Sequence, residues 1–442
     1  MVLADWLPNA TILKYYGYQA TDSVGFIWPI FTLFLLWNDL TFAQIGLLSA
    51  ISAVLVVCLE VPTGYVADRL GRRNALALGM VAMALSIIGF VVADAYWQFV
   101  VLYTLWAISI AFQSGTADAW LYDTLAADLR SGEFTRVRGR GGAVYEYASA
   151  ITMIMGGLLY VVHPTYPFVA SAILHACGIV IVYSMPQNAQ YSGERRAGSA
   201  DRTTGNSGDN DTPNTNHIHD TPPISIRESL SILRSTLLAR PLRAFVVYVA
   251  LFFAVVNATD TYIQPIAEDI LGGVLESPIV AATGATLPEP ALIGVLYACF
   301  AVVGAVASDN AARVRARFGL RAALIWLPVV VALALVVPAF LPLLAIPVFV
   351  LVKGVYALSK PLVNQYINDR ATATGRATVL SATSMGYAFV RAPLQPLAGG
   401  VADIVGPLAT VAGLGGVFLL GGLALLVVSR PVVVGEQVVT TE

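Results

Sequence analysis

Long apolar runs separated by short polar segments recur along the whole chain. Most of them hold about 20 residues, the length at which an apolar helix spans the hydrocarbon core of a bilayer. The runs are continuous rather than alternating, which favours helices over the strands of a membrane barrel. The pattern predicts an all-α membrane protein with twelve transmembrane helices at 14–37, 42–63, 74–94, 97–125, 141–162, 167–185, 243–266, 290–309, 320–338, 341–360, 377–399 and 406–429.

Composition agrees with this pattern. Of the 442 residues, 57% are hydrophobic and only 12% are charged, whereas a soluble domain is usually about 25% charged. We therefore expect a multi-pass membrane protein with the lipid bilayer as a partner.

The basic residues lie almost entirely on one set of loops. Of the 25 lysines and arginines, only Lys353 and Arg391 fall inside predicted spans rather than in alternate connecting segments or at their edges. Cytoplasmic loops of membrane proteins are rich in Lys and Arg. The distribution therefore predicts that both termini are cytoplasmic.

One long polar stretch divides the chain in the middle. Residues 187–240 are rich in Ser, Thr, Asn, Asp and Gly, which predicts a flexible cytoplasmic linker. Six spans precede it in 1–186 and six follow it in 241–442, which ends in a short tail. The two halves echo each other, since ATDSVGFIWPI in the first span has a partner in ATDTYIQPI in the seventh. Such repeats are typical of transporters.

The segment GYVADRLGRRN, residues 64–74, places a dense charged hairpin between two apolar runs. It resembles the loop between helices 2 and 3 of the major facilitator superfamily, which reads G-x-x-x-D-[RK]-x-G-[RK]-[RK]. Every fixed position is matched, by Gly64, Asp68, Arg69, Gly71, Arg72 and Arg73. The resemblance implies a fold of two six-helix bundles. It also implies that the loop acts as a gate, latching the cytoplasmic side while the cavity faces outward.

A second family pattern, G-x-x-x-G-P-x-x-G-G in helix 5 of antiporters, is matched here only at its end. Span 5 keeps Gly156 and Gly157, and span 11 keeps Pro396, Gly399 and Gly400. Paired glycines let membrane helices approach closely.

Charges inside the membrane are costly, so they usually face a cavity or a partner. Spans 1, 4, 7 and 10, which line the central cavity in the superfamily, each carry one, namely Asp22, Asp118, Asp260 and Lys353. Span 7 adds Asn257 and Gln264 on the face of Asp260, at helical spacing. We expect these residues to bind substrate or protons, the alternative being structural pairs such as a buried Asp–Lys bridge.

Glu60 and Asp123 lie near the inner ends of spans 2 and 4, and two further charges lie deeper within spans. Glu146 in span 5 is expected to pair with an arginine or to take a proton. Arg391 in span 11 has either a carboxylate partner or an anionic substrate as its counterpart.

The chain carries no motif of enzymatic chemistry. There is no P-loop, no H-E-x-x-H and no G-x-S-x-G, so we expect no enzyme, no catalytic residue and no cofactor. Cys58, Cys177 and Cys299 stand far apart in apolar runs, which gives no metal site. Energy must then come from an ion gradient, from the substrate's own gradient or from a partner. A buried carboxylate that takes a proton is the simplest coupling device.

We expect a secondary active transporter that exports a small, partly apolar compound with proton coupling. Its expected partners are the lipid bilayer, a small-molecule substrate and H+ as the coupling ion, with no nucleic acid, and we expect a monomer. Proton-coupled uptake of a polar or anionic metabolite is the alternative that Lys353 and Arg391 favour. A transporter-like membrane sensor is a third possibility. The 22 arginines against three lysines indicate a GC-rich prokaryotic genome, and hence a location in the plasma membrane of a prokaryote.

Overall fold

The computed structural model describes residues 9–127, 131–187, 240–276, 288–370, 376–429 and 431–432. Almost all of the predicted linker, 187–240, lies outside these ranges. Within them, ten helical segments are long and apolar enough to cross a membrane. They are α3 (Phe42–Leu70), α4 (Arg72–Phe90), α5 with α6 (Tyr96–Gln113 and Thr116–Ala127), α7 (Phe134–Val162), α8 (Tyr166–Ser184), α11 (Arg240–Leu275), α13 (Glu289–Asp309), α15 (Leu320–Val336), α16 (Ala345–Asn368) and α18 (Pro407–Ser429).

Two further segments complete the predicted set. Helix α17 (Arg376–Val405) corresponds to the eleventh span. The first span is formed by two shorter helices, α1 (Ala10–Thr21) and α2 (Phe31–Trp37). A short helix, α14 (Ala311–Phe318), follows α13.

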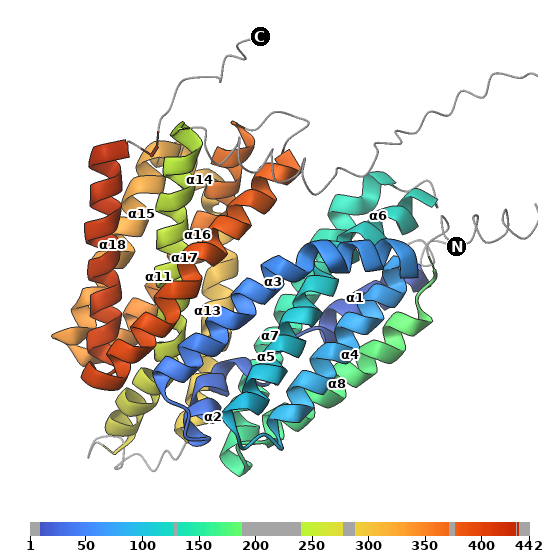
Figure 1. The fold of residues 1–442 in the computed structure, drawn as a ribbon, viewed down its shortest axis with the longest axis horizontal. Coiled ribbons are helices and arrows are strands. Elements are labelled where there is room, and N and C mark those ends of the chain that lie inside the picture. Colours follow the sequence, from blue (N-terminus) through green and yellow to red (C-terminus); the bar gives the residue numbers. More distant parts are fainter. Residues whose placement is uncertain are drawn as a thin grey trace, which may run out of the picture.

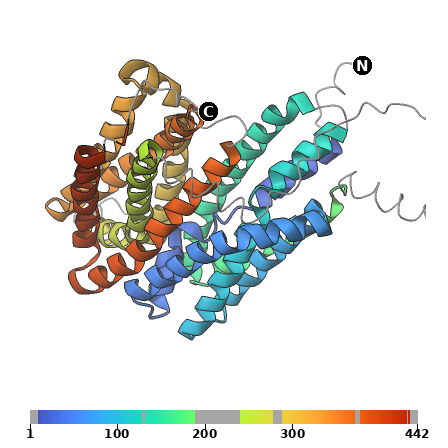
Figure 2. The same ribbon diagram turned by 45° about the horizontal axis from the view of Figure 1, so that its top comes forward.

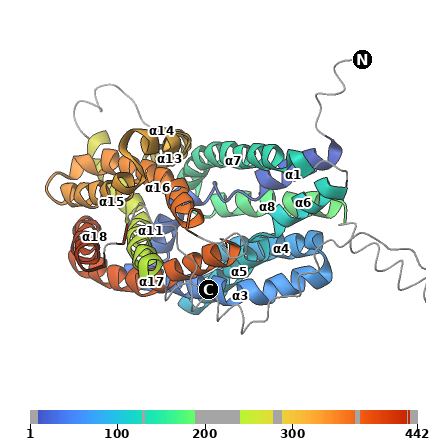
Figure 3. The same ribbon diagram turned by 90° about the horizontal axis from the view of Figure 1, so that it is seen from above.

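The helices form two groups that stand side by side (Figure 1). Helices α1 to α8 make one group and α11 to α18 the other, and the separation persists when the molecule is turned (Figure 2). Seen from above, α7 lies against α13 and α17 lies against α3 across the boundary (Figure 3). Each group has buried apolar clusters of its own, and Leu33 of α2 packs into the cluster of the second group.

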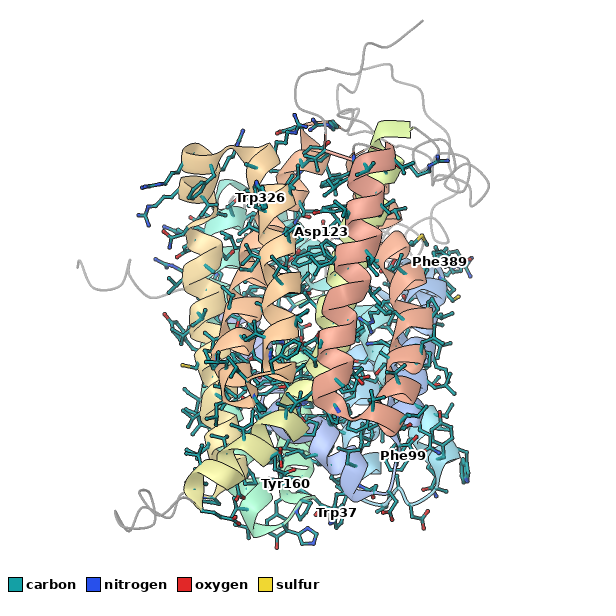
Figure 4. The ribbon with its side chains drawn as sticks, turned by 90° about the vertical axis from the view of Figure 1, so that its left-hand side faces the viewer. Trp37, Phe99, Asp123, Tyr160, Trp326 and Phe389 are labelled. Atoms are coloured by element: carbon teal, nitrogen blue, oxygen red, sulfur yellow. The ribbon has the colours of Figure 1, made fainter. Side chains whose placement is uncertain are left out.

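Large apolar side chains cover the outside of the bundle. Trp326 and Phe389 are 64% and 74% exposed (Figure 4). In water such a surface would drive association, whereas in a bilayer it faces lipid chains. A bilayer also requires backbone N–H and C=O groups to be hydrogen-bonded within the protein. A helix meets this requirement because it bonds these groups within its own segment.

The continuous helix that the apolar pattern predicts over 14–37 is wrong. The chain leaves the helix after Thr21 and resumes as a 3-10 turn at Trp28–Ile30. Gly25 lies in this break and packs closely against α7, where a Cβ would lie 2.0 Å from Thr152 Oγ1. Pro29 also has no N–H to donate. The predicted span 97–125 is broken as well, between α5 and α6, where Gly115 has φ of 71°.

The charged hairpin predicted around residues 64–74 is mostly helix. Helix α3 continues through Gly64 and Asp68 to Leu70, and α4 begins at Arg72. Gly71 alone makes the connection, with φ of 87°, a conformation that other residues adopt only under strain. In the second half, Gly319 joins α14 to α15 with φ of 78°. The two halves therefore turn the chain by the same device.

The closest contacts between the halves lie at one end of the bundle. We call the end that carries Arg72 and α14 the arginine-rich end. At the opposite end, a Cβ on Gly157 of α7 would lie 2.2 Å from Pro290 O, and a Cβ on Gly399 of α17 would lie 2.2 Å from Phe42 O. Gly46 and Gly294 pack against the same neighbouring helices. The predicted use of the glycine pairs is confirmed for Gly156, Gly157 and Gly399, whereas Gly400 faces open space.

Candidate substrate cavity

A cavity of about 640 Å³ lies between the two halves. This volume is in the range of pockets that hold drug-sized molecules. On the side of the first half its wall carries a group of aromatic side chains, including Trp28, Phe31, Tyr103 and Trp106. Phe31 is the centre of this group, with ring centroids 5.5 Å from Trp106 and 6.0 Å from Tyr103.

Spans 1, 4 and 7 line the cavity, as the resemblance implies. Span 10 contributes none of the lining residues that the described ranges contain, whereas α3 and α17 do. Ser49 and Ser52 of α3 and Gln113 of α5 also line the cavity, although they were not predicted to do so. Their position as polar residues within apolar runs is the signal that could have revealed them.

Asp22 lies at the break of the first span, directly after α1. It caps that helix and lines the cavity. Gln113 of α5 lies beside its carboxyl group. No lysine or arginine of the described residues forms an ion pair with it.

Asp260 lines the cavity from α11, and its carboxylate forms an ion pair with Lys353 of α16. This is the buried Asp–Lys bridge that the sequence analysis considered as an alternative. Both side chains are largely buried, at 25% and 16% exposure. Lys353 therefore contacts Asp260, which lines the cavity, but does not line the cavity itself.

Arg391 enters the cavity from α17, with Gln395 one turn further along the same helix. Its Nε atom is buried and has no hydrogen-bond partner, and neither has Oε1 of Gln395. Arg391 forms no ion pair with a described carboxylate. Tyr103 lies close enough to Arg391 to interact with it electrostatically.

The two amides predicted on α11 both line the cavity but differ in their contacts. Asn257 donates a hydrogen bond to Phe253 O of its own helix, at 2.7 Å. Gln264 crosses to the other half, where its Oε1 accepts from Thr32 N at 2.7 Å and its Nε2 donates to Trp28 O at 2.8 Å. It thereby satisfies backbone groups that the broken first span leaves free.

Asp118 and Glu146 are not among the residues that line the cavity. Asp118 pairs with Arg138 of α7 at 2.8 Å, and its side chain is 42% exposed. Glu146 lies on α7 with its side chain exposed, and Lys360 is close enough to influence it.

The residues of the charged motif make contacts within the first half. Arg72 pairs with Asp123 of α6 at 2.7 Å, and Arg73 donates to Met185 O at 3.2 Å. Asp123 lies toward the end of the bundle remote from Trp37 (Figure 4). Arg69 stacks over Tyr65 at 4.6 Å, and Asp68 is exposed.

Within the described ranges no group of three or more His, Cys, Asp or Glu residues is placed to hold a metal ion.

A family model for the Major Facilitator Superfamily matches residues 19–392. The chain belongs to the Major Facilitator Superfamily. It is therefore a membrane transporter of the secondary type, and not an enzyme. The resemblance carried by residues 64–73 is confirmed.

Two curated relatives match a part of the chain. The uncharacterized MFS-type transporter YxaM of Bacillus subtilis (strain 168) is 25% identical over 163 residues, and the tetracycline resistance protein, class D, of Salmonella ordonez is 28% identical over 160. Each match covers 36% of this chain, and 40% and 39% of the relative.

Solved structures match along nearly the whole length. The nucleoside transporter NupG has a TM-score of 0.72, with 10% identity, over 95% of this chain and 99% of that one. The D-xylose-proton symporter has a TM-score of 0.60, with 12% identity, over 94% and 95%. At such low identity these matches show the fold alone, and they confirm the two-bundle architecture.

Proposed function

We propose that this protein is a proton-coupled transporter that exports a small, partly apolar compound by alternating access. One observation carries the proposal: the cavity between the halves combines a group of aromatic side chains with Asp22, a carboxylate that has no ion-pair partner among the described residues. The local likeness to a tetracycline resistance protein supports export.

Asp22 is the group that we propose to carry the proton. A carboxylate held away from water and from cations takes up a proton more readily than an exposed one. Asp260 is less suited, because Lys353 stabilises its charged form. The proton on Asp22 then changes the charge of the cavity by one unit in each cycle.

We propose that the arginine-rich end faces the cytoplasm of a prokaryotic cell, as the positive-inside rule requires. The halves touch closely at the opposite end, through Gly157 and Gly399, so the described arrangement is closed on the outer side. The motif residues Asp68 and Arg72 would then contact the second half only in the conformation in which the cavity opens outward. The exposed position of Asp68 is consistent with this assignment.

A second candidate is proton-coupled uptake of an anionic metabolite. Arg391 favours it, because a buried guanidinium without a carboxylate partner is suited to an anionic ligand. In this case a proton on Asp22 would strengthen the binding of the anion by removing a negative charge from the same cavity.

Transport by the purified protein in proteoliposomes tests both candidates. Counterflow of drugs, sugars and organic acids identifies the substrate class, and a pH gradient of either sign then gives coupling and direction. Accumulation driven by protons moving against the substrate supports export, and accumulation with protons moving alongside it supports uptake. A counterflow substrate that ignores both gradients would contradict proton coupling.

A further inference from the structure

The cavity contains two buried polar groups that lack hydrogen-bond partners among the described residues, one a donor and the other an acceptor. Nε of Arg391 is a buried donor without an acceptor, and Oε1 of Gln395 is a buried acceptor without a donor. The two residues lie four positions apart on α17, and hence on one face of the helix. Gln395 is only 7% exposed, so both groups are held inside the protein.

Leaving such groups unpaired inside a protein is costly, and more so for a charged group than for a neutral one. Their natural partner in the protein would be a carboxylate. Asp260 lies close enough to Arg391 to interact with it electrostatically, as does Tyr356, but its ion pair is with Lys353. Asp22 lines the same cavity and forms no ion pair with Arg391. Among the described residues nothing therefore satisfies this face of α17.

We infer that Arg391 and Gln395 form the recognition site for an organic acid that carries a hydrogen-bond donor beside its carboxylate. The carboxylate binds the free edge of the guanidinium through Nε and a neighbouring Nη. The adjacent hydroxyl or amino group of the ligand donates to Oε1 of Gln395. This inference rests on the proposed function and specifies the substrate class.

The surroundings of the pair define the rest of the ligand. Tyr103 lies next to Arg391, and Phe31 and Trp106 continue the wall from there. Aromatic rings stack with flat apolar groups in offset or edge-to-face arrangements. The body of the acid is therefore flat and apolar, which agrees with a compound that is partly apolar overall.

Three small probes separate these features. Salicylate has the carboxylate, the neighbouring donor and the ring. Benzoate lacks the donor, and salicylamide lacks the charge. We expect binding to purified protein in nanodiscs, measured in the millimolar range by displacement of labelled salicylate, to fall in the order salicylate, benzoate, salicylamide.

Variants assign the effect to the two residues. Arg391→Gln should weaken salicylate binding about 10- to 100-fold, the worth of a charge-assisted hydrogen bond. Gln395→Glu should weaken it similarly by placing a carboxylate beside the guanidinium, and Gln395→Leu should remove the advantage of salicylate over benzoate. Arg136→Gln is the matched control, since Arg136 pairs with Glu133 at the surface, and its binding should equal that of the unaltered protein.

Three results would overturn the inference. In the unaltered protein these are binding of salicylamide as strong as that of salicylate, and no salicylate binding at all. In folded Arg391→Gln or Gln395→Glu protein it is unchanged salicylate binding. If Arg391→Gln does not fold, the probe series and the Gln395 variants decide. These binding measurements use no gradient, so their result does not depend on proton coupling. If the binding predictions fail, the proposed transport of a partly apolar compound still stands, with a neutral compound as the substrate.

Discussion

Gln264 of the second half accepts a hydrogen bond from the backbone N–H of Thr32 in the first half, at 2.7 Å. The same side chain donates to Trp28 O at 2.8 Å. One buried amide thus supplies both the acceptor and the donor that the broken first span lacks. Because these bonds cross between the halves, they must break if the halves separate at this point.

Replacing this amide is expected to loosen the contact between the halves. Gln264→Leu leaves two buried backbone groups unpaired, which should lower the free energy of unfolding by about 1–3 kcal/mol. It should also increase labelling of a cysteine placed at Ser49, a cavity residue, by an impermeant reagent added from outside. Asn257→Leu is the control, because Asn257 bonds only within α11. Equal labelling in both variants would show that Gln264 does not hold the halves together.

The glycines of α17 allow a sharper test of the interface at the opposite end. A Cβ on Gly399 would lie 2.2 Å from Phe42 O, whereas a Cβ on Gly400 would meet nothing within 4 Å. We expect Gly399→Ala to push α3 and α17 apart and to destabilise the protein by about 1–3 kcal/mol. Gly400→Ala should be neutral or stabilising by up to about 1 kcal/mol, since Ala favours a helix. Thermal unfolding of the two proteins measures the difference, and equal midpoints would contradict the contact.

Asp68 is expected to matter for the cycle rather than for the fold. Its side chain is exposed here, whereas Arg72 is paired with Asp123 at 2.7 Å. Asp68→Asn should therefore insert and melt as the unaltered protein does, while transport falls about tenfold because one conformational state loses a stabilising contact. The measurement is uptake into proteoliposomes with matched protein content. Full transport by inserted Asp68→Asn protein would mean that the motif serves insertion only.

Topology is checked by two single cysteines in a protein without Cys58, Cys177 and Cys299. One replaces Ser207, in the predicted linker, and the other replaces Thr283, in the segment between α11 and α13. An impermeant thiol reagent on intact cells should label the second and spare the first, because the arginine-rich end is expected inside. The reverse pattern would invert the orientation and with it the assignment of the closed side.

The helices could be predicted from the sequence because the bilayer imposes simple rules. Apolar runs near the thickness of a membrane gave most bounds to within a few residues, and the charged residues within them pointed to Asp22 and Asp260. The breaks could not be predicted. The one after Thr21 depends on Thr152, which leaves no room beside Gly25, and on Gln264, which satisfies the freed backbone. Both lie far away in the sequence.

The partners of the charges were equally beyond the sequence. Helical spacing places Lys353 and Asp118 on polar faces, but it does not say toward which neighbour each face turns. Lys353 turns to Asp260, and Asp118 turns to Arg138. Arg391 also lies within a predicted span, yet it forms no ion pair with a carboxylate among the described residues. Only the packing of one helix against another separates these cases.

Proton coupling is the last expectation, and it rests on Asp22. Asp22, Asp260 and Asp118 are the acidic residues well inside the spans expected to line the cavity, and the last two are engaged by Lys353 and Arg138. A nearby cation favours the charged form of a carboxylate, so the carboxylate without an ion-pair partner is the one best suited to bind a proton. Asp22→Asn imitates the protonated form permanently. It should abolish transport driven by a pH gradient while leaving counterflow, which needs no net proton movement, largely intact.

The three Asn variants of Asp22, Asp260 and Asp118 are best measured as pairs of assays, gradient-driven flux and counterflow, in the same proteoliposomes. Asp118→Asn is the internal control, because it removes a charge outside the cavity, and its gradient-driven flux should persist. Asp260→Asn should lower both activities together, since it leaves Lys353 unpaired beside the cavity. Gradient-driven flux that survives in Asp22→Asn would exclude this carboxylate as the proton carrier, because no group of that side chain could then bind and release a proton.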